Sequence, residues 1–110
     1  MKFSIFMMPL HHPTESPSLA FSRDIELVRY ADELGFDEFF IGEHHSGGWE
    51  TMPAPEMALA KASAHAHRIR LGTSVISVPF HHPFHVAERM AFLDTLLKDG
   101  RSSAVAPARS

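Results

Sequence analysis

The sequence contains no cysteine, and this absence removes several kinds of functional site at once. A disulfide framework, an iron–sulfur centre, a thiolate zinc site and a cysteine nucleophile all require thiols. Any metal would therefore need histidine and carboxylate ligands.

The chain also lacks a surplus of basic charge and a long apolar run. Its 10 Lys and Arg stand against 13 Asp and Glu, so the formal net charge is −3. Without a basic field, neither nucleic acid nor an anionic membrane surface is an expected partner. Every apolar run is shorter than the roughly 18 to 20 residues of a membrane span. We therefore expect a cytoplasmic protein, and the 45% hydrophobic content is that of a globular domain.

Short apolar runs alternate with helical patterns along most of the sequence. Runs that begin near positions 2, 38 and 70 predict strands, because each is too short for a helix. Between and after them, the pattern predicts three helices: one capped by Ser22 and stopped by Gly35, one over Glu56–Ala66, and one opened by Pro83. Units of roughly 35 residues are the size expected for parallel strands joined by crossover helices.

This α/β pattern predicts the first three βα units of a TIM-type (β/α)8 barrel, truncated, over residues 1–101. Residues 102–110 fit neither period, so we expect a flexible or aberrant tail there. A small doubly wound sheet is the alternative, and it would require a reversal of strand order. If all helices cover one face of the sheet, the other face is left to water. The residues expected on that open face are Phe3, Ile5, Phe39, Ile41 and Val75.

Six of the nine histidines form three doublets, and each doublet follows a predicted strand. They are His11 with His12, His44 with His45, and His81 with His82. The carboxyl ends of parallel strands meet at one rim, where catalytic groups gather in α/β folds. Neighbouring strand residues point to opposite faces, so at most one histidine of each doublet should enter a pocket.

The doublet after the second strand carries the strongest chemical signal. Glu43 beside His44 and His45 offers a carboxylate and imidazoles for proton transfer, or ligands for a metal. We assign no metal, because the doublets lack the separated ligand spacing of zinc sites. For His81, His82 and His85 we expect structural capping of the third helix, with His85 on its solvent-facing side.

Two segments together carry a resemblance to a known family. EFFIGEHHSGGWE and RIRLGTSVISVPFHHPFHVAERMAFLD resemble the flavin-dependent luciferase-like monooxygenases, and the resemblance covers about residues 1–101. It implies a βα barrel that uses reduced FMN, delivered by a separate flavin reductase, and O2 to oxidise a small organic substrate. Deazaflavin is the alternative cofactor, and a homo- or heterodimer is implied.

The resemblance also implies roles for individual residues. His44 matches the family's active-site histidine, which acts as an acid or base near the flavin, with Glu43 and His45 as neighbouring support. Ser74 and Val75 match a non-proline cis peptide beneath the flavin ring, so the implied cofactor contacts are Ser74, Val75 and His44. We expect this bond to relax to trans in the chain alone. After Arg101 the sequence departs from the family, which continues into a fourth strand.

Three functions follow from these patterns. The first is a flavin-dependent monooxygenase, of which this chain is an incomplete N-terminal fragment. The second is a non-catalytic fragment or dimer-partner polypeptide. The third is a metal-dependent hydrolase, which would take up its metal through His44, His45, His81 or His82.

Overall fold

A computed structural model describes residues 1–97 and 103–107 of the chain, and strands alternate with helices throughout. The strands are β1 (Ser4–Met7), β2 (Glu38–Ile41), β3 (Arg70–Ile76) and β4 (Ser103–Pro107). The helices are α1 (Pro17–Leu34), α2 (Pro55–Ser63) and α3 (Pro83–Leu96), and a short 3₁₀ turn, η1 (Val78–Phe80), follows β3. No helix in the described part of the chain is long and apolar enough to cross a membrane.

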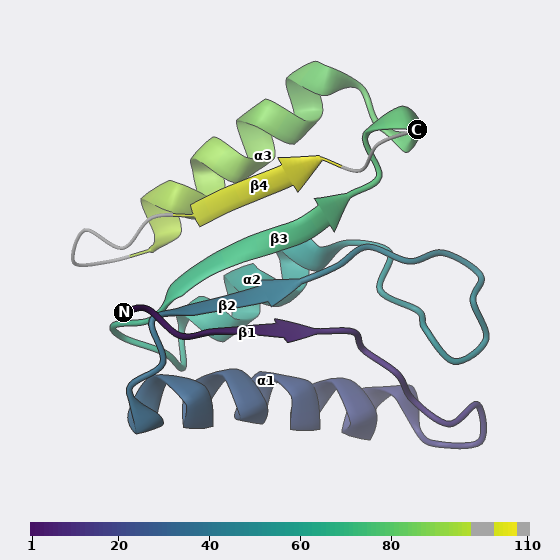
Figure 1. The fold of residues 1–110 in the computed structure, drawn as a ribbon. Coiled ribbons are helices and arrows are strands. Elements are labelled where there is room, and N and C mark those ends of the chain that lie inside the picture. The colour runs from purple at the N-terminus through teal and green to yellow at the C-terminus, as the bar shows by residue number, and fades with distance from the viewer. Residues whose placement is uncertain (98–102, 108–110) are drawn as a thin grey trace.

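The four strands form one parallel sheet in the order β1-β2-β3-β4 (Figure 1). Because this order follows the sequence, the sheet has no reversal point, and the doubly wound alternative is wrong. Sequential parallel strands with intervening helices are the arrangement of a βα barrel, as predicted. All the arrowheads in Figure 1 point the same way, so the loops that follow the strands gather at one rim.

The core lies between the sheet and the helices. Alternate strand residues such as Phe39, Ile41 and Leu71 are fully buried and pack in one cluster with helix residues. The helix residues of this cluster include Val28, Ala31, Leu59, Ala62, Met90 and Leu93. All three helices therefore contribute to the same core on one side of the sheet.

The open face carries different residues from those predicted. Phe39 and Ile41 were expected there but are buried against the helices, and Ile5 packs against the same core cluster. Phe3 is exposed, but it precedes β1. The strand register places Phe6 beside Phe40, and Phe40 beside Gly72. Phe6 is 53% exposed, because its face of the sheet has no helix over it. The prediction assigned alternate strand residues to the wrong face of the sheet. Both faces of each strand are apolar, so the sequence pattern does not show which face meets the helices.

The prediction of a flexible tail is wrong for residues 103–107, which form β4. This strand pairs with β3 in parallel, with Leu71 opposite Ser103 and Thr73 opposite Val105. Small residues carry little periodic signal, so the segment is recognisable as a strand only from its pairing. We expected the chain to depart from the family after Arg101, before a fourth strand. The structure has a fourth strand there. Residue 102 and residues 108–110 lie outside the described part of the chain.

Helix boundaries follow the predicted signals except at the start of α1 and at the end of α2, which stops at Ser63 and not at the predicted Ala66. Helix α1 begins at Pro17, five positions before the predicted cap Ser22, because proline is favoured in the first turn of a helix. It ends at Gly35, which adopts a φ of 93° as predicted for a helix stop. Helices α2 and α3 begin at Pro55 and Pro83, in agreement with the sequence.

Asp32 fastens the end of α1 to the entry of β3. Its carboxylate accepts hydrogen bonds from the backbone N–H groups of His67, Arg68 and Ile69, at 3.0, 3.0 and 2.7 Å. Burial by itself would raise the pKa of Asp32, but the three backbone donors outweigh it and hold the pKa below its ordinary value. This carboxylate therefore helps to set the position of β3 in the sheet.

Candidate active site

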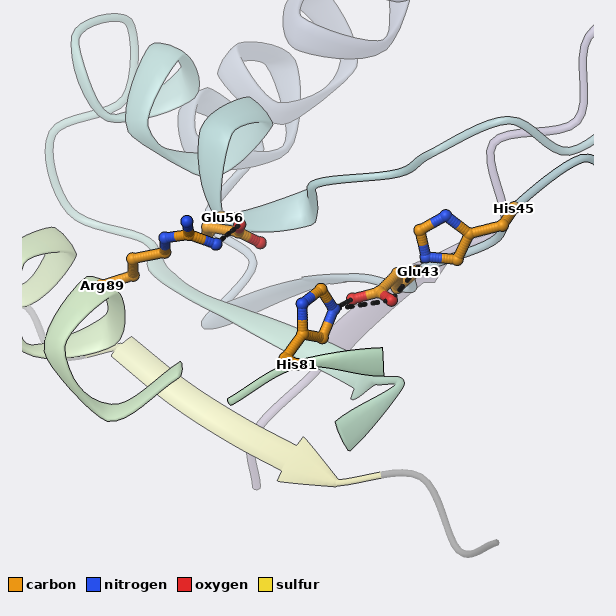
Figure 2. A network of polar contacts seen from close by, with 5 residues as sticks. All are labelled: Glu43, His45, Glu56, His81 and Arg89. Atoms are coloured by element: carbon orange, nitrogen blue, oxygen red, sulfur yellow. Dashed lines mark hydrogen bonds and ion pairs between the residues drawn. The ribbon is translucent and has the colours of Figure 1, made fainter. Parts of the chain in front are cut away.

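Two of the three histidine doublets converge on a single carboxylate at the rim of the sheet. His45 donates from Nε2 to Oε2 of Glu43 at 2.6 Å, and His81 Nε2 lies 2.8 and 2.9 Å from the two oxygens of the same carboxylate. Figure 2 shows the two rings on either side of the Glu43 carboxylate. One member of each of these doublets enters the cluster, as the alternation of strand side chains predicted.

Glu43 is placed by the close approach of β2 and β3. Its backbone N–H donates to the carbonyl oxygen of Val75 at 2.9 Å. At the preceding position, a Cβ added to Gly42 would lie 2.8 Å from the carbonyl oxygen of Ser74, so only glycine fits there. The Glu43 side chain is 0% exposed. A buried carboxylate needs hydrogen-bond donors, and the two imidazoles provide them.

The contact of His81 with Glu43 was not predicted from the sequence, which favoured a capping role for His81. His81 follows η1, its backbone N–H donates to Val78 at 3.0 Å, and its ring is 20% exposed. Capping was predicted for His81, but its neighbour His82 caps α3, where Nδ1 accepts from the N–H of Phe84 at 3.1 Å. The adjacency of β2 and β3 was the available signal, because it brings the segments after both strands to one place.

His44 lies beside this cluster but does not join it. Its Nδ1 is 3.4 Å from Glu50, and its side chain is 38% exposed. Its backbone pairs with Met52 in both directions, at 3.0 and 3.1 Å, which fixes the loop between β2 and α2. The side chains of Glu43 and His45 therefore belong to the cluster with His81, whereas the side chain of His44 faces the loop between β2 and α2.

The Ser74–Val75 peptide bond is cis, so the expectation that it would be trans in this chain is wrong. The bond lies in β3, and its two residues are the ones that approach Gly42 and accept from Glu43. The two segments for which the family resemblance implies cofactor contacts are thus adjacent in space.

The third doublet takes part in other contacts. His11 is buried and pairs with Asp24 of α1 at 2.7 Å, while the ring of His12 packs edge-on against Trp49. Burial raises the pKa of Asp24, and the adjacent His11 opposes this effect. This doublet therefore anchors the loop after β1 to α1.

The cluster can do two kinds of chemistry. A carboxylate between imidazoles can hold or pass a proton, and the same atoms are metal ligands. One ligand atom from each of Glu43, His45 and His81 lies within 4.8 Å of the others. Nearby, Arg89 of α3 and Glu56 of α2 form an ion pair at 3.8 Å, which joins the two helices beside the cluster (Figure 2).

Comparison with known proteins agrees with this architecture. Residues 1–103 match the family described as luciferase-like monooxygenase. The chain is 48% identical over 96 residues to the 4-hydroxyprotoasukamycin monooxygenase of Streptomyces nodosus subsp. asukaensis, which covers 87% of this chain and 26% of that protein. It is also 48% identical over 94 residues to the limonene 1,2-monooxygenase of Rhodococcus erythropolis, covering 86% of this chain and 24% of that protein.

A solved structure shares the whole fold. It is the oxygenating constituent of the 3,6-diketocamphane monooxygenase of Pseudomonas putida, a type II Baeyer–Villiger monooxygenase in complex with FMN. The TM-score is 0.91 at 27% identity, and the match covers 100% of this chain and 30% of that one. The chain thus spans about a quarter to a third of the length of these relatives. With its parallel βα units and a family match over residues 1–103, the chain belongs to the luciferase-like monooxygenase family.

Proposed function

We propose that this chain forms the N-terminal part, over residues 1–101, of a flavin-dependent monooxygenase that uses reduced FMN and O2 on a small organic substrate. The observation that carries the proposal is the meeting of the Glu43–His45 run with Ser74 and Val75 at the carboxyl end of the sheet. This rim is where βα barrels place their reacting groups. FMN is preferred to deazaflavin because the similar Pseudomonas monooxygenase structure holds FMN.

Small residues at the ends of β2 and β3 support the binding of a flat ring system. Gly42, which directly follows β2, adjoins Ser74 of β3. A glycine beside a serine at the ends of β2 and β3 leaves room for a ligand to approach the backbone closely. Ser74, Val75 and His44 would hold the flavin, which when bound supplies the activation of O2.

His44 is the group proposed to exchange a proton at the flavin. With Nδ1 turned toward Glu50, its Nε2 is available to donate or accept a proton at the cofactor. Glu50 Oε1 is buried without a hydrogen-bond partner among the described residues, so Glu50 retains an acceptor for orienting that ring. Glu43 and His45 are positioning residues, because they tie the backbone on either side of His44 to the end of β3.

A separate flavin reductase is the proposed partner, since the similar Pseudomonas protein is described as an oxygenating constituent. We propose that this partner supplies the reduced flavin. A homo- or heterodimer is proposed on the same resemblance.

A chimaera tests the proposed function. The segment of the limonene monooxygenase that matches this chain would be replaced by residues 1–103, and limonene oxidation would be measured with reduced FMN. We expect His44→Ala to lower kcat by at least about tenfold, because a proton-transfer group is lost, and to leave FMN binding largely intact, because Ser74 and Val75 remain. His12→Ala is the control and should keep full activity. Unchanged turnover in His44→Ala would remove His44 from the mechanism.

The open face of the sheet favours a second candidate, a non-catalytic polypeptide that pairs with another chain. Phe6 is 53% exposed beside Phe40, and exposed apolar faces of this kind mark interaction surfaces. A chimaera that folds and binds FMN but shows no turnover would favour this candidate.

A further inference from the structure

The cluster at the rim has the composition of a transition-metal site. Two imidazole nitrogens and one carboxylate oxygen come from Glu43, His45 and His81, and their ligand atoms lie within 4.8 Å of one another. Histidine nitrogen with carboxylate oxygen is a ligand set that Zn²⁺ and similar divalent ions accept, and three protein ligands leave one coordination position open. Neither doublet alone could provide this set, because each contributes one ring.

The backbone holds the three ligands in place before any ion arrives. Glu43 is fixed by its N–H bond to Val75 at 2.9 Å, and His81 by its N–H bond to Val78 at 3.0 Å. The ring of His45 packs edge-on against Phe80 with centroids 5.3 Å apart. Little conformational freedom remains to be lost on binding, which favours affinity.

The distances require only a small opening of the cluster. The Nε2 atoms now lie 2.6 to 2.9 Å from the carboxylate oxygens, as hydrogen bonds do. Ligand atoms around a tetrahedral Zn²⁺ with bonds near 2.1 Å are separated by about 3.4 Å. Binding an ion would require each ring to move away from the carboxylate by roughly 1 Å or less. The rings of His45 and His81 are 37% and 20% exposed, so neither is enclosed tightly enough to prevent this movement. The same exposure gives an ion a path to the carboxylate.

We propose that Glu43, His45 and His81 bind one divalent transition-metal ion, with Zn²⁺ and Co²⁺ as the probes. Each ring coordinates through Nε2 and carries its proton on Nδ1, and the Glu43 carboxylate supplies the negative charge. The ion replaces the two hydrogen bonds to the carboxylate and joins the ends of β2 and β3. His44, the residue proposed to exchange a proton at the flavin, is not among the ligands, whereas Glu43 and His45 are also the residues that position it.

Titration of the full 110-residue chain with Co²⁺ tests this site. We expect uptake of one equivalent, the visible absorption of tetrahedral cobalt, and displacement by Zn²⁺. His81→Ala should weaken Co²⁺ binding by more than about tenfold, because one of three ligands is lost. Circular dichroism of the variant checks that it is folded, and Glu43→Gln gives a second test that preserves the side-chain volume.

Exposed histidines elsewhere provide the matched control. The rings of His82 and His85 lie 5.6 Å apart on the surface of α3 and could bind an ion by themselves. A His82→Ala/His85→Ala variant should keep the full affinity. Failure of the wild-type chain to take up one equivalent would overturn the proposal. So would an equivalent that is lost in this control variant and retained in His81→Ala.

Discussion

At the scale of single residues, Asp32 makes the clearest contribution to stability. It lies in α1, yet it accepts three backbone hydrogen bonds from the segment that leads into β3. Asp32→Ala leaves those N–H groups without their acceptor, so we expect the free energy of unfolding to fall by about 2 kcal/mol. Urea denaturation followed by circular dichroism measures this change.

The same carboxylate gives the chain an acid-dependent part of its stability. Because the pKa of Asp32 is lowered in the folded state, its contribution is fully present above the unfolded value of about 3.9. The contribution is lost as the pH falls through the lower folded value, and Asp32→Ala should lack it. Glu33→Ala is the control, since Glu33 forms only an exposed pair with Arg29 and should leave stability nearly unchanged. Equal losses in the two variants would contradict the role of Asp32.

At the scale of secondary-structure elements, the junction of β2 and β3 places the site. In Gly42→Ala, the added methyl group would lie 2.8 Å from the carbonyl oxygen of Ser74, and the strand ends would have to separate. We expect a loss of about 1 to 3 kcal/mol in the free energy of unfolding. Amide exchange measured by NMR should also become faster at Glu43, whose N–H bonds to Val75 across this junction.

Two comparisons make this measurement specific to the junction. The N–H of Phe36 bonds to Ala31 at the end of α1, so its exchange should be unaffected by Gly42→Ala unless the whole chain is destabilised. A Cβ at Gly48 meets no atom within 4 Å, so Gly48→Ala tests a glycine of positive φ without a steric clash. Unchanged exchange at Glu43 in Gly42→Ala would show that the strands tolerate the methyl group.

Helix ends could be predicted from the sequence because the backbone preferences of single residues determine them. Strand β4 and the orientation of the strands were harder to predict because they depend on pairing and packing between distant segments. Gly35, Pro55 and Pro83 mark helix ends through their own backbone preferences, and the structure places those ends at the same positions. Strand β4 was missed because its pairing with β3 is a long-range property. The side of the sheet on which Phe39 lies was also missed, because strand phase depends on where the helices pack.

The site divides in the same way. The sequence places Glu43, His44 and His45 at the end of a strand, and parallel pairing brings that end to the rim. Which histidine of each doublet turns toward Glu43 depends on the turns that follow each strand. For His81 that turn is η1, and nothing in its three residues indicates the direction of the next ring.

At the scale of the whole molecule, the helices cover one face of the four-stranded sheet and leave the other face open. The helices cover the face that carries Phe39, while Phe6 remains on the face without helices. The relatives that share this architecture are three to four times longer, since the chain spans 24 to 30% of their lengths. In the 110-residue chain taken alone, a ligand at the rim would touch one part of the barrel wall and the loops that follow its strands.

This geometry predicts that the 110-residue chain binds FMN weakly or not at all. Small-molecule sites enclose most of the ligand surface, and one wall of a barrel cannot do so. Quenching of FMN fluorescence on titration with the chain measures the affinity. The chimaera that adds the remaining length of the limonene monooxygenase is the control, and it should bind FMN at least about a hundredfold more tightly because the cofactor is then enclosed. Tight one-to-one binding by the chain alone would mean that Ser74, Val75 and His44 hold the flavin without the rest of a barrel.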